Sequence, residues 1–266
     1  METNTNNTPG ISVRNCNLWY GDFHALKDIN VDMPSKEITA LIGPSGCGKS
    51  TLLRIIGNLD KPTSGTIEYR DGADQQMGFV FQDSVLLPWK NVRQNAEFPL
   101  VIQKKQTEEN EKKLDELLEL AGLSEFKTAL PRELSGGMKR KLMVCRALLT
   151  DPEILLLDEP TAGMDALSRR QMWNLLRKLN GKNLTILLTT HYMEEAQNLC
   201  SRVALMDHGK LEEVSTPSAL INSLGNYTVD EFSGDETKSH YFHTREEAIA
   251  YLSGLSGQAS RSEEHT

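Results

Sequence analysis

The stretch that most constrains the fold of this 266-residue chain is a glycine-rich segment, residues 43–51. In order, it consists of Gly43, Pro44, Ser45, Gly46, Cys47, Gly48, Lys49, Ser50 and Thr51. An apolar run over 38–42 precedes it, and a segment of helical character over 52–56 follows it. A strand, a G-x-x-x-x-G-K-[ST] loop and a helix in this order are the context that a phosphate-binding loop requires. The sequence therefore predicts that this segment binds the phosphates of a nucleotide.

Each part of the loop has a physical reason to bind phosphate. Glycines let the backbone curl so that its N–H groups point inward, toward phosphate oxygens. The helix that begins near Lys49 adds its positive dipole end and its unpaired N–H groups. We expect the Lys49 ammonium to reach the β- and γ-phosphates and the Ser50 hydroxyl to ligate Mg²⁺. The alternative is a glycine-rich turn that binds nothing, which would not need the flanking strand and helix.

Two carboxylates follow an apolar run later in the chain. Residues 154–157 are Ile-Leu-Leu-Leu, and Asp158 and Glu159 come directly after them. An apolar run that ends in acids is typical of a buried parallel strand, because ligands sit beyond the carboxyl ends of such strands. We expect Asp158 to hold Mg²⁺, directly or through water, and Glu159 to accept a proton from an attacking water. The alternative is an acid pair that caps a helix ahead of Pro160.

Two further segments also carry residues that could contact phosphate. The run 185–190 ends at His191, and a histidine at this end of a strand is placed to contact a γ-phosphate, although a lone histidine is usually structural. Ser135, Gly136 and Gly137 precede a helix predicted over 139–149 and would form a second anion-binding nest. In isolation, Ser-Gly-Gly is common loop chemistry.

Composition narrows the class of protein. Hydrophobic residues make up 38% of the chain and charged residues 25%, which is ordinary for a soluble globular protein. The net charge of −8 argues against a nucleic-acid binder, and four scattered cysteines without a C-x-x-C pair argue against zinc or a disulfide framework. The longest aliphatic runs are far below the roughly 18 residues of a membrane span, and the first residues do not form a signal peptide. We expect a cytoplasmic protein that reaches a membrane only through a partner.

The order of the motifs is more specific than any one of them. The loop at 43–51, a strand ending at Gln82, the Leu-Ser-Gly-Gly segment at 134–137, the acids at 158–159, Gly-Met-Asp at 163–165 and His191 follow one another. Over roughly residues 11–215, this set resembles the ATP-binding subunit of an ABC transporter. The resemblance implies an α/β P-loop NTPase of the ABC-ATPase fold. In that fold, a mixed core sheet is flanked by helices and accompanied by an antiparallel β subdomain and a helical subdomain.

The resemblance also implies a role for each motif in binding and hydrolysing ATP. Tyr20 would stack on the adenine, and residues 43–51 would be the Walker A loop. Gln82 would be the Q-loop residue, which touches Mg²⁺ and the attacking water. Asp158 resembles the Walker B aspartate, Glu159 the catalytic glutamate and His191 the switch histidine.

Other motifs would act between two copies of the chain. Ser135, Gly136 and Gly137 resemble the signature that closes on the γ-phosphate of ATP held by a second copy, and Asp165 resembles the D-loop aspartate. The resemblance thus implies a head-to-tail homodimer held together by ATP, with Mg²⁺ as the metal. The membrane partner would be a transmembrane permease, which would hold the chain on the inner face of the cell membrane. No nucleic-acid partner is expected.

The direction of transport is open at this level. Residues 18–51 resemble importers of phosphate, and residues 81–100 resemble importers of sulfonates or nitrate. Residues 138–142 and 189–196 resemble exporters of drugs, polysaccharides or lipids, and this longer group makes an exporter the expected type. A non-transport ABC ATPase is a remote alternative, because the chain has neither a long coiled coil nor a second cassette. A GTPase or small-molecule kinase would leave the Ser-Gly-Gly and Asp-Glu-Pro segments unexplained.

The expected domain limits follow. Residues 1–10 are predicted to be disordered, and residues 11–224 to form the cassette, with its helical subdomain at about 84–150. Residues 225–252 are predicted to form a small α+β appendage of unknown role, which we expect to be regulatory or to stabilise the dimer. Residues 253–266, rich in Ser and Gly, are predicted to be a disordered tail.

Overall fold

The structure is a computed structural model that describes residues 9–70, 76–224, 227–233, 236–242, 244, 246–247 and 249–251. The chain divides into two compact units, Met1–Val214 and Ser215–Thr266. Most of the predicted N-terminal disordered segment and all of the predicted tail lie outside the described residues. The first unit contains every residue predicted to take part in nucleotide chemistry.

A six-stranded sheet forms the centre of the first unit. In sheet order its strands are β5 (Met77–Val80), β6 (Ile154–Asp158), β7 (Thr185–Thr190), β3 (Ile38–Ile42), β8 (Arg202–Asp207) and β9 (Lys210–Ser215). The pairs from β5 through β8 are parallel, whereas β9 follows β8 through a two-residue turn, as only an antiparallel edge strand does. Every residue of β3, β6 and β7 is buried, as expected for parallel strands covered on both faces.

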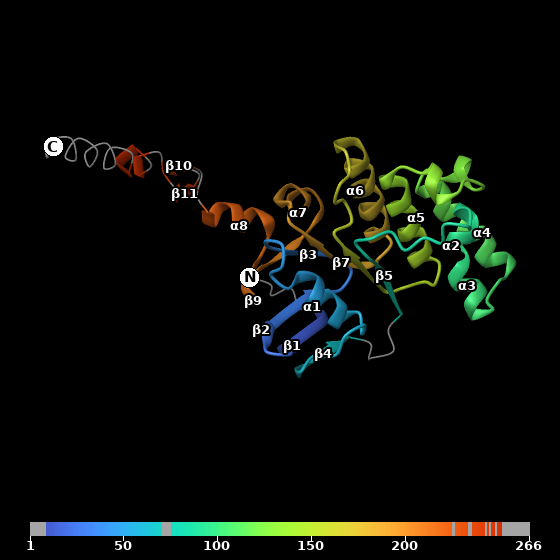
Figure 1. Ribbon diagram of the computed structural model, residues 1–266, viewed down its shortest axis with the longest axis horizontal. Helices are drawn as coiled ribbons and strands as arrows, with labels where there is room; N and C mark the ends of the chain where they lie inside the picture. Colours follow the sequence, from blue (N-terminus) through green and yellow to red (C-terminus); the bar gives the residue numbers. More distant parts are fainter. Residues whose placement is uncertain are drawn as a thin grey trace, which may run out of the picture. The chain divides into compact units, whose positions relative to one another are not determined.

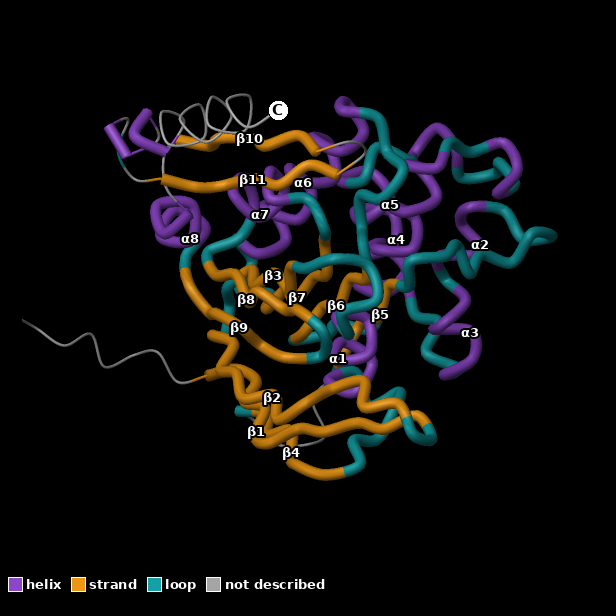
Figure 2. The backbone as a smooth tube through the Cα atoms, turned by 60° about the vertical axis from the view of Figure 1, so that its left-hand side comes forward, coloured by secondary structure: helices purple, strands orange, loops and turns teal. Residues whose placement is uncertain are grey.

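A second, antiparallel sheet packs below the first with one helix between them. Its strands, in the order β2-β1-β4, are β1 (Pro9–Tyr20), β2 (Phe23–Pro34) and β4 (Ser64–Tyr69). The helix α1 (Lys49–Ile56) lies between this sheet and the core sheet (Figure 2). Leu52, Leu53 and Ile56 of α1 are fully buried in a core shared with β1, β2, β6 and β7. This packing fixes the start of α1, and therefore the glycine-rich loop, against the core sheet.

Four helices gather to one side of the first unit, away from the antiparallel sheet (Figures 1 and 2). They are α2 (Val92–Ala96), α3 (Phe98–Gln103), α4 (Glu108–Leu120) and α5 (Gly136–Leu148), with short 3₁₀ turns at Ser124–Phe126 and Pro131–Glu133. The Thr107 hydroxyl caps α4 by accepting from Asn110 N–H, and Gly122, at φ +70°, follows its end. The helix α4 is amphipathic, and it buries Leu114 and Leu118.

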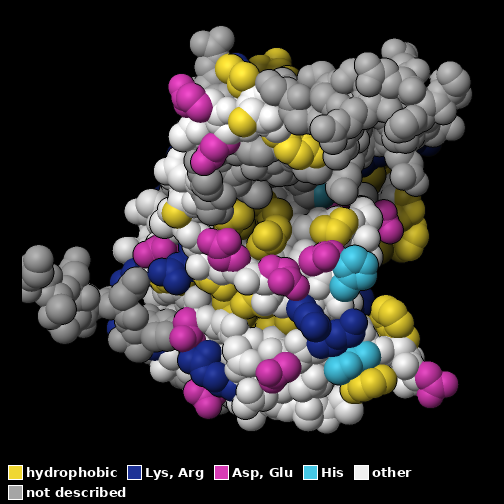
Figure 3. All heavy atoms as spheres, turned by 90° about the vertical axis from the view of Figure 1, so that its left-hand side faces the viewer, with side chains coloured by type: hydrophobic (Ala, Val, Ile, Leu, Met, Phe, Trp, Pro, Cys, Tyr) yellow, Lys and Arg dark blue, Asp and Glu magenta, His cyan; other side chains and the backbone are white. Residues whose placement is uncertain are grey.

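Two helices that the sequence analysis did not define cover the other face of the core sheet (Figure 2). They are α6 (Ala166–Asn180) and α7 (Met193–Leu199). On α6, Met172, Trp173 and Leu176 are buried. Acidic and basic side chains are interspersed over the face of the molecule shown in Figure 3. Within the described part of the chain, no helix is both long and apolar enough to cross a membrane.

The second unit contains α8 (Pro217–Leu224) and an antiparallel pair, β10 (Tyr227–Ser233) and β11 (Glu236–Phe242). The two strands lie within the small α+β appendage expected over 225–252. Residues 246–247 and 249–251 of the same expected appendage are helical. The helix α8 groups with this unit rather than with the first. The domain limits expected from the sequence, and a role for this unit, stay predictions.

Candidate functional site

The glycine-rich loop joins β3 to α1 and borders a cavity of about 360 Å³. Its described lining is Ser45, Gly46, Gly48, Lys49, Ser50, Thr51, Gln82 and Glu159. At Gly46, which has φ +80°, an added Cβ would meet no atom within 4 Å. The backbone of the loop is therefore open on this side, as the approach of a phosphate requires. Residues from three parts of the chain line this cavity, all of them predicted from the sequence.

Lys49 lies inside the curl of the loop. Its side chain is buried, and Nζ donates hydrogen bonds to the carbonyl oxygens of Gly43, at 2.8 Å, and Pro44, at 2.9 Å. These bonds hold the ammonium against the loop backbone at the border of the cavity, where a lysine of this motif can reach a bound phosphate. The donor set and the open glycine backbone fit the phosphates of ATP.

Ser50 and Asp158 meet although they are far apart in the sequence. The Ser50 hydroxyl donates to Asp158 Oδ1 at 2.7 Å, and the Thr189 hydroxyl donates to the same oxygen at 2.6 Å. Hydroxyl and carboxylate oxygens are ligands that Mg²⁺ accepts. No cluster of three or more His, Cys, Asp or Glu suited to a metal occurs in the described ranges. One hydroxyl and one carboxylate from the chain fit a Mg²⁺ ion that keeps waters and phosphate oxygens as most of its ligands.

Glu159 is the centre of a second group of side chains. Its Oε1 lies 3.3 Å from His191 Nδ1, and its Oε2 lies 3.5 Å from Gln82 Nε2. Both distances are longer than the roughly 2.7–3.2 Å of typical N–H···O hydrogen bonds. The three residues follow the carboxyl ends of β6, β7 and β5, so the parallel sheet brings them together. Glu159 has φ +44°, a left-handed conformation that non-glycine residues adopt at a cost of about 1–3 kcal/mol.

Two residues of this site were missed by the sequence analysis. Thr189 stands opposite Asp158 in the register of β6 and β7, and its hydroxyl also accepts from Glu159 N–H at 2.9 Å. Arg140 of α5 approaches the carbonyls of Phe81, at 3.4 Å, and Glu159, at 3.3 Å. Burial lowers the pKa of Arg140, opposed by the nearby carboxylates. A threonine inside an apolar strand was the only sequence signal for Thr189, and Arg140 gave none beyond its place in a predicted helix.

Replacement of Thr189 by valine tests whether the Thr189 hydroxyl holds Asp158 and Glu159 in place. The valine variant should lose about 1–3 kcal/mol of unfolding free energy, because Asp158 and the N–H of Glu159 lose a shared partner. Turnover of ATP should fall as well, because Glu159 is no longer held in place. Urea denaturation and steady-state hydrolysis would measure the two effects.

Thr39→Val is the matched control. The Thr39 hydroxyl is buried and has no hydrogen-bond partner among the described residues, so its removal should leave stability unchanged or slightly higher. Equal losses in the two variants would contradict the role given to Thr189.

The remaining predicted residues lie outside this cavity. Tyr20 ends β1 and is 52% exposed. Ser135 caps α5, where its hydroxyl accepts from Met138 N–H at 3.2 Å, and Gly136 and Gly137 open that helix. Asp165 caps α6, and hydrogen bonds from Ser168 keep the pKa of its carboxyl below the usual value. Within one chain these groups do not reach the residues around Glu159, and their roles stay predictions.

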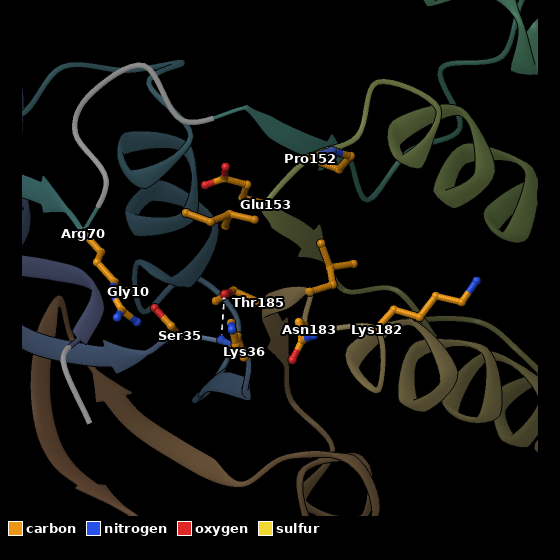
Figure 4. A pocket seen from close by; sticks show the side chains of 11 residues that line it. Gly10, Ser35, Lys36, Arg70, Pro152, Glu153, Lys182, Asn183 and Thr185 are labelled. Atoms are coloured by element: carbon orange, nitrogen blue, oxygen red, sulfur yellow. Dashed lines mark hydrogen bonds between the residues drawn. The ribbon is translucent and has the colours of Figure 1, made fainter. Parts of the chain in front are cut away.

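A larger cavity, of about 480 Å³, lies at the end of the core sheet where its parallel strands begin, opposite the glycine-rich loop (Figure 4). Lys36, Glu153 and Thr185, at the starts of core strands, are among its lining. The Lys182 side chain at its rim extends away from the other labelled residues (Figure 4). None of the residues predicted from the motifs lines this cavity, so the candidate site is the cavity at the glycine-rich loop.

Comparison with known proteins places this geometry in context. A family model described as "ABC transporter" matches residues 26–162. The Sulfate/thiosulfate import ATP-binding protein CysA of Nocardia farcinica is 40% identical over 234 residues, which are 85% of this chain and 70% of that protein. The protein of the same name from Pectobacterium atrosepticum is 38% identical over 248 residues, covering 89% of this chain and 75% of that one.

Solved structures give a similar result. The structure of cbiO1 from Clostridium perfringens, part of the ABC transporter complex cbiONQ, has a TM-score of 0.74 and 30% identity, covering 80% of this chain and 90% of that one. The ATP-binding cassette MJ0796, in a dimeric post-hydrolysis state bound to ADP and Pi, has a TM-score of 0.70 and 32% identity. That likeness covers 78% of this chain and 98% of MJ0796.

Proposed function

Because the chain belongs to the ABC transporter family, we propose that it is the ATP-hydrolysing subunit of an importer. As a member of the family, it is an ATP-binding subunit and an ATPase. The family match and the similar structures confirm both the resemblance and the α/β ABC-ATPase fold predicted from the sequence. The direction of transport is not given by the family, and we infer it from the named functions of the relatives.

The observation that carries the direction is the function named for the relatives. They are import proteins and align with 85% or more of this chain. The exporter type expected from residues 138–142 and 189–196 is not supported, because those short patterns cover far less of the chain than these alignments do. The named cargo of the relatives, sulfate or thiosulfate, makes a small oxyanion the cargo class that we propose.

Hydrolysis is assigned to the residues around the loop. Lys49 and the loop N–H groups bind the phosphates, and Ser50, Asp158 and Gln82 would hold Mg²⁺. When bound, Mg²⁺ supplies positive charge that neutralises the phosphate oxygens. Glu159 is oriented by Gln82, His191 and the Thr189 hydroxyl, and it accepts the proton of the attacking water.

A second copy of the chain would complete each site. Ser135 and Asp165 both lie outside the cavity of their own chain. The dimeric state of the similar cassette MJ0796 supports a homodimer, in which these motifs would reach the nucleotide of the partner. ATP would then stabilise the closed dimer, because the nucleotide binds more tightly to that state than to separated copies.

The helices α2–α5 are the surface that we assign to the permease. Large apolar side chains are exposed on α3, with Ile102 at 66%, and on the loop before α2, with Trp89 at 72%. Exposed apolar groups of this kind mark sites of protein association. Docking at this surface would place the chain on the inner face of the cell membrane.

The proposal is tested by capture from native membranes. The Glu159→Gln variant, loaded with ATP, is expected to stall as the closed complex, and mass spectrometry would identify the proteins that remain bound to it. A permease whose operon also encodes an extracytoplasmic oxyanion-binding protein would support import. A membrane subunit with no such binding protein would favour export, and the absence of any membrane protein would contradict a transport role. A Lys49→Ala variant, expected to lose ATP binding, controls for ATP-independent capture.

A further inference from the structure

Arg169 contacts two loops next to the candidate site, although it does not line the cavity. It lies in the first turn of α6, and its Nη2 donates to the carbonyl of Met164 at 3.4 Å. Its guanidinium carbon is 4.9 Å from the centre of the Tyr192 ring, within the range of a cation–π contact. One side chain thus holds the loop before Asp165 and the loop after His191.

The contacts continue from Tyr192 to the reacting group. The rings of Tyr192 and His191 pack with centroids 4.0 Å apart, and His191 Nδ1 lies 3.3 Å from Glu159 Oε1. The path runs from the Met164 carbonyl through Arg169, Tyr192 and His191 to the Glu159 carboxylate. Of the residues along this path, only His191 and Tyr192 are adjacent in the sequence, so the other contacts are made by the fold.

The guanidinium of Arg169 has few polar partners among the described residues. Its Nε is buried and has no hydrogen-bond partner among the described residues. Nη1 lies 3.6 Å from Glu194 Oε2 at the surface. Glu195, fully buried, accepts from Trp173 Nε1 at 3.1 Å, and burial raises the pKa of its carboxyl against the effect of the Arg169 charge. A buried N–H left unpaired costs stability, so the position of this guanidinium is not explained by hydrogen bonding alone.

We propose that Arg169 is a positioning residue for His191, acting through the Tyr192 ring. The inference rests on the proposed roles of Glu159 and His191 in hydrolysis. The guanidinium fixes the Tyr192 ring, which fixes the His191 ring so that Nδ1 faces Glu159. Because the same guanidinium holds the Met164 carbonyl, a displacement of the loop before Asp165 also moves His191. The state of that loop is thereby transmitted to the histidine within one chain.

A double-mutant cycle tests the proposal with the full-length protein and ATP. Arg169→Leu and Tyr192→Leu should each lower kcat about tenfold or more, since small displacements of a reacting group are costly. The KM for ATP should stay within about twofold, because neither residue borders the cavity. The double variant should be no slower than either single variant, because both break one path. Tyr192→Phe keeps the ring, so its kcat should stay near the wild-type value, unlike that of Tyr192→Leu.

Arg170→Leu is the matched control, since Arg170 is the exposed neighbour on the same helix. Thermal unfolding of each variant separates loss of positioning from loss of folding. An unchanged kcat in Arg169→Leu, or effects that multiply in the double variant, would overturn the proposal while leaving the ATPase assignment intact. If the Glu159→Gln variant, with Arg169 and Tyr192 unchanged, still hydrolysed ATP, the result would instead contradict the proposed catalytic roles themselves.

Discussion

Replacement of Glu159 by glutamine is expected to lower kcat for ATP by about 10²–10⁴-fold while ATP binding persists. Glutamine has the same shape and can keep contacts with Gln82 and His191, which lie 3.5 Å and 3.3 Å from the carboxylate oxygens. It cannot accept a proton from the attacking water. The N–H of Glu159 still donates to Thr189, so the backbone of the site should not move. The variant should therefore bind ATP and accumulate as a dimer.

Steady-state hydrolysis, equilibrium ATP binding and gel filtration with and without ATP measure these three properties. Glu153→Gln is the control, because Glu153 is an exposed glutamate just before the opposite end of β6. Its replacement should change none of them. A Glu159→Gln variant that kept a tenth of the wild-type rate would argue for a different proton acceptor.

Gly43→Ala is expected to destabilise the protein by about 3 kcal/mol and to abolish nucleotide binding. A Cβ at this position would lie 2.0 Å from the Met206 carbonyl oxygen of β8 and 2.8 Å from Cys47 Sγ. The first clash is with backbone, so the loop and the strand would have to separate. That separation would also strain the bond from Gly209 N–H to the Cys47 carbonyl. The loop could then no longer hold Lys49 in its present position.

Gly46→Ala separates the effect of this clash from that of backbone conformation. Gly46 also has a positive φ, of +80°, but an added Cβ there would touch nothing within 4 Å. Its replacement should cost about 1–2 kcal/mol of conformational strain and leave the fold intact. Urea denaturation of both variants, with and without ATP, would measure the difference. If Gly43→Ala were as stable as Gly46→Ala, the close approach of β8 to the loop would be wrong.

The sequence by itself determined the local features that carry the chemistry. The loop at 43–51 was readable because glycine spacing and the Lys49-Ser50 pair have a direct backbone consequence. The strands β3, β6 and β7 were readable because buried parallel strands are continuous apolar runs. Their polar ends, including Asp158 and His191, followed at once. The resemblance to the family came from the order of these motifs and is confirmed.

Other local features were not readable from the sequence. Neither α6 nor α7 was defined, because no motif marked their limits in the sequence analysis. The patterns at 138–142 and 189–196 indicated an exporter, whereas the similar relatives are named import proteins, because two short segments of a cassette say little about its membrane partner.

The tertiary structure decided which of the chemical groups meet. Ser50 and Asp158 share a hydrogen bond across 108 positions of sequence because the sheet order places β6 two strands from β3, with β7 between them. Thr189 joins them through the register of β6 and β7. The Arg169–Tyr192 contact depends on how α6 packs beside α7. Such contacts follow from the order of strands and the packing of helices, which depend on interactions between distant segments that no local sequence pattern encodes.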